Sequence, residues 1–319
     1  MQMSSSLHAK LYRSLYRIRR AEEEIALIYP TDKIKSPTHL AIGQEAVAVG
    51  VCEALEPGDI AFGTYRSHAC YLAKGGDLNK MMAELYGKVT GCAKGKGGSM
   101  HLIDPAHGFM GTSAVVATTI PLAVGYAYAL TLQGRAQVVV SFFGEGAVEE
   151  GAFHESMNFA ALKQVPVLFV CENNRYAIHS PQRARQRLDN ICERARAYGM
   201  PAQRIEDNDT LAIYEAARQA AETARRGGGP AFLECMTYRW REHVGPGDDV
   251  ALDYRTREEI QGWIDRDELP RIAALLEAAE RSRIEAEVEA ELQAAIAFAE
   301  ASPLPDASEL YADVYAATS

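Results

Sequence analysis

The sequence has no long apolar run, no closely spaced cysteine pair and no dense cluster of basic residues. No apolar stretch approaches the roughly 20 residues of a membrane-spanning helix. Residues 1–10 lack the apolar segment of a secretory signal peptide. The six cysteines are dispersed without a C-x-x-C pair, and several lie in apolar runs where a buried, inert thiol is expected. Together these absences predict a cytoplasmic protein that does not span or bind a membrane.

Charge and composition narrow the class further. The chain carries 33 Lys and Arg residues against 43 Asp and Glu, for a net charge of −10, and it has no basic patch of the kind that nucleic-acid binding needs. A content of 48% hydrophobic and 24% charged residues is ordinary for a soluble protein, and 319 residues suffice to bury a core. Because no internal repeat or low-complexity linker divides the chain, we expect a single domain.

The most informative stretch is residues 137–176. A β-branched apolar run at 138–143 stops at a Gly-Glu-Gly turn, and apolar residues then recur at helical spacing from about residue 151 to 164. Pro166 ends that helix, and a second apolar run follows at 167–171. Strand, turn, helix and strand form a βαβ unit, whose two strands are parallel. The stretch therefore predicts an α/β fold with a central, mostly parallel sheet.

Two oxygen-bearing side chains follow the ends of these predicted strands. Glu145 comes after the first and Asn174 after the second, at the sheet edge where open α/β folds bind ligands. A carboxylate and an amide oxygen are ligands of the kind that Mg²⁺ or Ca²⁺ takes. Gly144 and Gly146 allow backbone N–H groups to approach an anion, and the following helix N-terminus favours negative charge. Since the chain is itself anionic, a bound diphosphate would need such a cation.

Other glycine-rich patterns fit less well. A dinucleotide fingerprint requires G-x-G-x-x-G, but its third glycine position is occupied by Glu149. The run from Gly91 to Ser99 has the wrong spacing for a phosphate-binding Walker loop and no Ser or Thr after its lysine. A plain strand-to-helix turn, with glycines for geometry only, stays open on the G-x-G alone. The paired Asn173 and Asn174 argue against it.

The order of motifs along the chain resembles one enzyme family. G-E-G-x-x-x-x-G-x-x-x-E-x-x-N from Gly144, followed by N-N-R-Y, is similar to the thiamine diphosphate motif. In detail the chain resembles the α subunit of the thiamine-dependent first component of 2-oxo acid (pyruvate or branched-chain) and acetoin dehydrogenase complexes. Further matching motifs are H-L-x-x-G-Q-E-A (39–46), Y-R-x-H (65–68), G-K-G-G-S-M-H (95–101), I-P-L-A (120–123) and T-Y-R (237–239).

The resemblance implies a thiamin diphosphate-binding fold with helices on both faces of the sheet. It implies one domain over residues 1–319, with helical extensions at about 1–30 and 256–319. It also implies a set of ligands for thiamine diphosphate and Mg²⁺. The metal would be held by Glu145, Asn174 and the Tyr176 carbonyl, and the cofactor by Tyr65, Arg66, Ala114, Val116, Gly144, Glu145, Gly146, Ala147, Asn174, Tyr176 and His243. His68 and His243 are the candidates for proton transfer or for binding charge near the reacting centre.

The chain departs from the family pattern at three places. Glu145 stands where the motif has Asp, so the carboxylate is one methylene longer. The loop after T-Y-R reads E-H-V-G-P-G-D-D from Glu242, with Val244 where some relatives carry a phosphorylated serine. The glutamate that acts on the aminopyrimidine ring belongs, in split members of the family, to a β subunit. We therefore expect this chain to be inactive alone and to form its sites with a β partner, as an α₂β₂ tetramer.

These features predict an oxidoreductase subunit. The enzyme would cleave a C–C bond next to a carbonyl of a 2-oxo acid or acetoin, and would pass the acyl group to a lipoyl domain of an acyltransferase component. One alternative is a thiamine-dependent carboligase or decarboxylase subunit without a lipoyl acceptor, for which the altered 242–249 loop is the motive. Another is a non-catalytic cofactor-binding subunit, for which Glu145 is the motive. The substrate cannot be read from this chain, because much of the pocket would come from the β partner.

Overall fold

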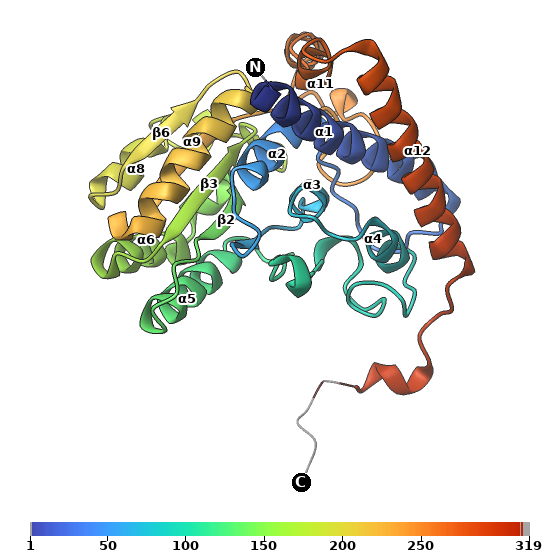
Figure 1. The fold of residues 1–319 in the computed structure, drawn as a ribbon, viewed down its shortest axis with the longest axis horizontal. Coiled ribbons are helices and arrows are strands. Elements are labelled where there is room, and N and C mark those ends of the chain that lie inside the picture. The colour runs from blue at the N-terminus through green and yellow to red at the C-terminus, as the bar shows by residue number, and fades with distance from the viewer. Residues whose placement is uncertain (1, 313, 315–319) are drawn as a thin grey trace.

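The computed structural model describes residues 2–312 and residue 314 and centres on a parallel sheet (Figure 1). Five strands follow one another in the order β1-β2-β3-β7-β6, and every neighbouring pair is parallel. A short antiparallel pair, β4 and β5, lies beyond β3 in the chain. The strands are β1 Ile60–Phe62, β2 Val139–Gly144, β3 Val167–Asn173, β4 Tyr176–Ala177, β5 Ser180–Pro181, β6 Ala202–Ile205 and β7 Ala231–Met236.

Helices cover both faces of this sheet, and alternating strand residues supply the two cores. On one face Val140 and Val170 pack with residues of α1, α2, α9 and α12. On the other, Val139 and Phe169 pack with residues of α5, α6 and α8. Such burial of both faces explains why the strands are continuous apolar runs. The helices are α1 Gln2–Ile28, α2 Glu45–Glu53, α3 His68–Ala73, α4 Leu78–Leu85, α5 Thr119–Leu132, α6 Gly151–Lys163, α7 Gln182–Arg185, α8 Cys192–Ala197, α9 Thr210–Thr223, α10 Arg257–Ile264, α11 Glu268–Ala273 and α12 Ala278–Ala301.

The predicted βαβ unit is confirmed as β2, α6 and β3. A single 3₁₀ segment, Glu145–Glu149, links β2 to α6. The helix ends at Lys163, the next residue Gln164 adopts a left-handed conformation (φ 49°), and Pro166 comes two residues later. In the pairing of the two strands, Gly144 lies beside Glu172. The glycine-rich turn and the Asn-Asn pair therefore meet at one edge of the sheet.

The terminal helices pack against each other. Leu11, Ile18 and Ile25, spaced seven residues apart on one face of α1, are fully buried. Arg17 and Arg20 of α1 form ion pairs with Glu291 and Glu289 of α12 at 2.7 and 2.5 Å, and Figure 1 shows the two helices crossing at the upper edge. Residues 313 and 315–319 of the predicted C-terminal extension lie outside the described residues. The single-domain division stays a prediction.

Between residues 2 and 312, no helix combines the length and apolar character that crossing a membrane requires.

Candidate active site

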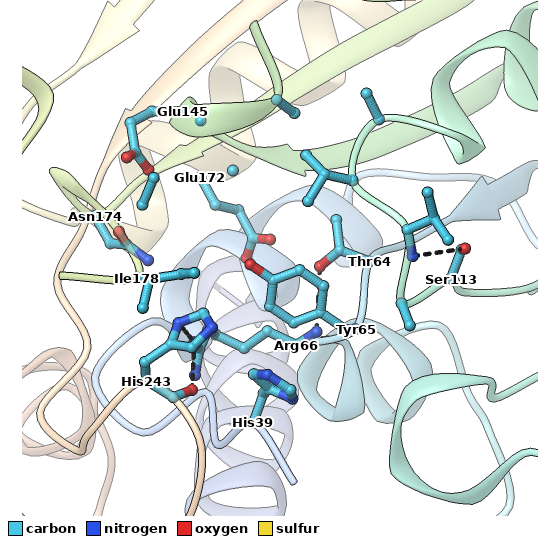
Figure 2. A pocket seen from close by; sticks show the side chains of 18 of the residues that line it. His39, Thr64, Tyr65, Arg66, Ser113, Glu145, Glu172, Asn174, Ile178 and His243 are labelled. Carbon is cyan, nitrogen blue, oxygen red and sulfur yellow. Dashed lines mark hydrogen bonds between the residues drawn. The ribbon is translucent and has the colours of Figure 1, made fainter. Parts of the chain in front are cut away.

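The residues predicted to bind cofactor surround one cavity of about 470 Å³ (Figure 2). It opens at the carboxyl ends of β2 and β3, as expected for a parallel sheet. Loop residues after β1 and the loop after β7 complete its walls. All of the predicted cofactor-binding residues line this cavity: Tyr65, Arg66, Ala114, Val116, Gly144, Glu145, Gly146, Ala147, Asn174, Tyr176 and His243.

The predicted metal ligands lie on the β2–β3 side of the cavity. The Glu145 side chain is almost fully buried and pairs with Arg185 at 2.5 Å. Burial raises the pKa of Glu145, and the positive charge of Arg185 offsets part of that rise. Asn174 donates from Nδ2 to Gln44 Oε1 at 3.0 Å, and its Oδ1 accepts the Tyr176 N–H at 3.1 Å.

This oxygen set fits a hard divalent cation: one carboxylate, one amide oxygen and one backbone carbonyl are ligands that Mg²⁺ accepts, with water or phosphate oxygens as the rest. Among the residues that the structure describes, no cluster of three or more His, Cys, Asp or Glu side chains is placed to bind a metal. A metal here would therefore depend on the mixed oxygen set and on oxygens from a bound ligand.

The backbone beside these ligands is tightly constrained. A Cβ on Gly146 would lie 2.9 Å from the Ala177 Cβ, so only glycine allows the turn to approach β4. Ala117, Arg175 and Ile178 all adopt left-handed φ values, between 53° and 71°. Residues other than glycine rarely adopt this conformation, and it often occurs at ligand sites, so these three residues support a binding role for the turns around the cavity.

Arg66 and His243 meet on the opposite wall. Arg66 donates to the Leu40 carbonyl and to the His243 carbonyl, both at 2.8 Å, and its Nη2 lies 3.2 Å from His243 Nδ1. Because a guanidinium can only donate, Nδ1 must accept, and the neutral ring then carries its proton on Nε2. Burial, with Arg66 as the next cause, lowers the pKa of His243 to about 3. Burial also lowers the pKa of Arg66 to about 10.

Comparison with known proteins identifies the family. A model described as "Dehydrogenase E1 component" matches residues 13–308. The α subunit of acetoin:2,6-dichlorophenolindophenol oxidoreductase from Bacillus subtilis is 41% identical, over 96% of this chain and 92% of that protein. Pyruvate dehydrogenase E1 α subunits from Porphyra purpurea and Rhizobium meliloti are 36% and 37% identical, over 94% and 96% of this chain and 90% and 89% of theirs.

The chain belongs to the dehydrogenase E1 component family. This confirms the resemblance read from the motifs, the thiamine diphosphate-binding fold class and the prediction of an oxidoreductase of the E1 α-subunit type. The roles of individual residues in the cavity of this E1 component remain predictions.

Among the cavity-lining residues that the sequence-based set did not include are two buried titratable ones, His39 and Glu172. The His39 ring lies 4.5 Å from Tyr65 and 5.0 Å from His243, between ring centroids. Within the described residues its buried Nδ1 has no hydrogen-bond partner, and burial, followed by the charge of Arg66, lowers the pKa of His39 to about 3. His39 opens the H-L-x-x-G-Q-E-A motif, so its position was a usable signal.

The other is Glu172, whose side chain points into the cavity toward Tyr65 (Figure 2). The residue is only 5% exposed. Burial raises the pKa of Glu172 to about 7, against the opposing effect of Arg66. Within the described part of the chain its carboxylate has no hydrogen-bond or ion-pair partner. Strand alternation was the available signal, since residues two apart share a face and Asn174 was already a candidate.

His68 does not reach the cavity of this E1 component. It begins α3 and is fully buried, with Nδ1 3.1 Å from Glu22 Oε1 and Nε2 2.8 Å from Ser99 Oγ. Tyr65 and Arg66 precede that helix and line the cavity, whereas the first helical turn directs His68 into the protein interior. Direct proton transfer by His68, as predicted from the Y-R-x-H motif, is not supported by this placement.

The loop that departs from the family pattern is ordered by its own contacts. The Glu242 side chain accepts the Gly247 N–H at 2.7 Å. Asp249 is fully buried and pairs with Arg239 at 3.1 Å and with Arg255 at 2.7 Å. Val244 is exposed. The changed sequence therefore still forms a defined loop that brings His243 to the cavity.

Proposed function

We propose that the cavity binds thiamine diphosphate with Mg²⁺ and that a β-type subunit completes it. The enzyme would oxidatively cleave acetoin or a 2-oxo acid and pass the product to a lipoyl acceptor. The observation that carries the proposal is the convergence of Glu145, Gly146 and Asn174 with Arg66 around one cavity at the sheet edge. The side-chain oxygens of Glu145 and Asn174 suit a metal, and the Arg66 guanidinium suits a phosphate.

In this proposal the two sides of the cavity divide the cofactor between them. Glu145, Asn174 and the Tyr176 carbonyl hold Mg²⁺. Tyr65, Arg66 and the backbone N–H groups of Gly146 and Ala147, beside Gly144, bind the diphosphate, because fixed donors and a guanidinium offset its charge. The apolar wall at Ala114 and Val116 accepts the ring portion.

The bound cofactor supplies a nucleophilic carbon and an electron sink for cleavage next to a carbonyl. The protein residues supply orientation and proton control. His243 stays a neutral imidazole near pH 7 and, with Nδ1 turned to Arg66, keeps Nε2–H for donation to a bound group. His39 is also neutral, and its Nδ1, which has no partner among the residues that the structure describes, can accept a proton or a hydrogen bond. His68 has no such access, so we assign it no direct step.

The β-type partner is proposed from two observations. The relatives are named α subunits, which implies a second kind of subunit in those enzymes. In this chain Val115 and Val116 beside the cavity are 64% and 45% exposed, as apolar residues at a subunit contact would be in the isolated chain. An α₂β₂ assembly, with the aminopyrimidine-side glutamate supplied by the partner, is the arrangement we propose, in the cytoplasm.

Acetoin is the first substrate to test, since the 41% identical relative is an acetoin oxidoreductase subunit. Pyruvate is the second, because the pyruvate dehydrogenase subunits named above are 36–37% identical. Oxidation of either, assayed with an artificial electron acceptor and with free lipoamide, separates a dehydrogenase from a carboligase or decarboxylase. Activity with the dye but none with lipoamide would reject the lipoyl acceptor.

The decisive experiment is calorimetric titration of thiamine diphosphate into this chain co-purified with a β-type subunit, with and without Mg²⁺. We expect metal-dependent binding by the complex and weak or absent binding by the chain alone. A folded complex that ignores the cofactor under both conditions would reject the proposed function. Glu145→Ala in the complex is the control, since it removes the only carboxylate among the three proposed metal ligands.

A further inference from the structure

Arg185 makes a buried ion pair with the carboxylate that we assign to the metal. Its Nη2 lies 2.5 Å from Glu145 Oε1, its Nη1 pairs with Glu149, and its Nε donates to the Ser180 carbonyl at 3.2 Å. The Arg185 side chain is 14% exposed and that of Glu145 is 2% exposed. The guanidinium is thus held in place from three directions.

The segment around Arg185 is fixed to the same turn. Gln186 donates from Nε2 to the Glu145 carbonyl at 3.0 Å and to Glu149 at 2.9 Å. The Arg185 Nη1 lies 3.7 Å from where a Cβ of Gly146 would stand. Arg185 is not among the residues that line the cavity. It therefore reaches Glu145 through the wall, from the α7 side.

The longer side chain at position 145 sets up this contact. A glutamate carboxylate reaches one methylene further from the backbone than an aspartate carboxylate, so Glu145 can extend to Arg185. A buried carboxylate without a partner is costly, and Arg185 removes that cost when no metal is bound. A divalent cation bound to the same carboxylate would be repelled by the guanidinium of Arg185, which is hydrogen-bonded to that carboxylate. Whether the guanidinium stays or moves aside, its charge opposes the metal.

We propose that Arg185 is an internal counter-ion that competes with the divalent cation for Glu145 and so sets the metal affinity of this chain. The inference rests on the proposed function and adds a residue that no family motif marks. It has two opposite consequences. Removing the charge of Arg185 should tighten metal binding, and it should also destabilise the metal-free protein, because Glu145 is then buried without a partner.

The test is a Mn²⁺ titration of the complex with its β-type subunit, at pH 8 and a fixed concentration of thiamine diphosphate. Binding is measured from the EPR signal of the free Mn²⁺. Arg185→Gln is expected to bind Mn²⁺ about tenfold more tightly, or roughly 1.4 kcal/mol, and to melt at a lower temperature than wild type without metal. If Arg185 had only a structural role, its replacement would lower the melting temperature without increasing the affinity for Mn²⁺.

Arg183→Gln is the matched control. Arg183 lies on the same helix, is exposed, and loses the same charge, but it makes no hydrogen bond or ion pair with Glu145 in the described residues. We expect its Mn²⁺ affinity to equal that of wild type. In a Glu145→Asp background the shorter carboxylate no longer reaches Arg185, so the effect of Arg185→Gln should shrink toward zero.

The outcomes separate the two levels of the argument. If Glu145→Ala abolishes Mn²⁺ binding but Arg185→Gln leaves it unchanged or weakens it, Arg185 is not a competitor and the inference is wrong. Weaker thiamine diphosphate binding by Arg185→Gln would make Arg185 a diphosphate ligand, which also overturns it. If Glu145→Ala binds Mn²⁺ like wild type, the metal is not on Glu145 and the metal site of the proposed function fails as well.

Discussion

Two groups of buried ionisable side chains, one in the loop that carries His243 and one in the cavity, differ in how their polar atoms are hydrogen-bonded. In the first, Asp249 accepts hydrogen bonds from Arg239, Arg255 and Tyr254. Burial opposes ionisation of Asp249, but these hydrogen bonds outweigh it and lower its pKa. Arg255 in addition donates to the Arg239 and Arg241 carbonyls, both at 2.7 Å. In this group, which we call the loop cluster, both carboxylate oxygens of Asp249 have partners, and among the described residues its one buried polar atom without a partner is Arg239 Nε.

The second group is in the cavity and consists of Glu172 and His39, whose side chains have polar atoms without hydrogen-bond partners in the described residues. The Glu172 carboxylate has no partner within the described residues, and the buried Nδ1 of His39 has none either. Buried polar groups are normally satisfied, so a buried carboxylate and a buried ring nitrogen that both lack partners in one cavity point to a ligand. The comparison teaches that burial of charge alone does not mark a site. What distinguishes the cavity from the loop cluster is a buried carboxylate, that of Glu172, which has no partner within the described residues, whereas both oxygens of Asp249 have partners.

The largest effect is expected from breaking the loop cluster. Asp249→Asn removes the one negative charge between two arginines whose side chains are almost fully buried. Removal of one partner from a buried ion pair typically costs about 3–5 kcal/mol. We expect the urea midpoint of the chain to fall accordingly. Asp248→Asn is the control: this neighbouring acid is exposed, and its ion pair with Arg257 is long, at 3.7 Å, so less than about 0.5 kcal/mol should be lost. Equal losses in the two variants would contradict the comparison.

The same chemical change in the cavity should have the opposite sign. Glu172→Gln neutralises a buried carboxylate that lacks a partner, so we expect the protein without ligand to gain roughly 1–2 kcal/mol at pH 8. The measurement is again the urea midpoint, now compared with Asp249→Asn under identical conditions. A loss of stability in both variants would show that Glu172 is satisfied and that the two regions do not differ. Because the cavity is proposed to bind cofactor, the stability gain should be accompanied by weaker thiamine diphosphate binding.

Arg66 connects the two regions, and its replacement should act on binding more than on folding. Arg66→Lys keeps the charge but loses the planar set of donors that reaches Leu40 and His243. We expect thiamine diphosphate to bind about tenfold more weakly, or roughly 1.4 kcal/mol, in calorimetric titration with Mg²⁺. Arg241→Lys, in the loop that carries His243 and outside the residues that line the cavity, should bind thiamine diphosphate as wild type does. Unchanged affinity in Arg66→Lys would remove Arg66 from the diphosphate site.

Part of this site could be predicted from the sequence because its geometry is local. The apolar runs, the Gly-Glu-Gly turn and Pro166 determine a βαβ unit, and parallel pairing then brings Gly144 beside Glu172. The placement of His68 outside the cavity could not be predicted, since motif spacing does not reveal that α3 begins at this residue and turns it inward. The Arg185–Glu145 pair joins residues 40 positions apart, and no local pattern encodes a contact of that range. Many of the residues that line the cavity could thus be predicted, whereas Arg185, which pairs with Glu145 from outside the cavity, could not.

The smallest effect concerns pH and the two cavity histidines. Burial is the main cause that lowers the pKa of both His39 and His243 to about 3, from an ordinary value near 6.5. Between about pH 6.5 and pH 3 the unfolded chain therefore binds more protons than the folded one, so stability falls as the pH is lowered through this window. His39→Asn removes one of the two imidazoles that cause this difference in bound protons. Its deficit relative to wild type should therefore shrink by no more than about 1 kcal/mol between pH 7 and pH 5.5. If the stability deficit of His39→Asn stayed constant or grew toward pH 5.5, the His39 imidazole would be charged in the folded protein. The proposal that neutral His39 accepts a proton in the cavity would then be wrong.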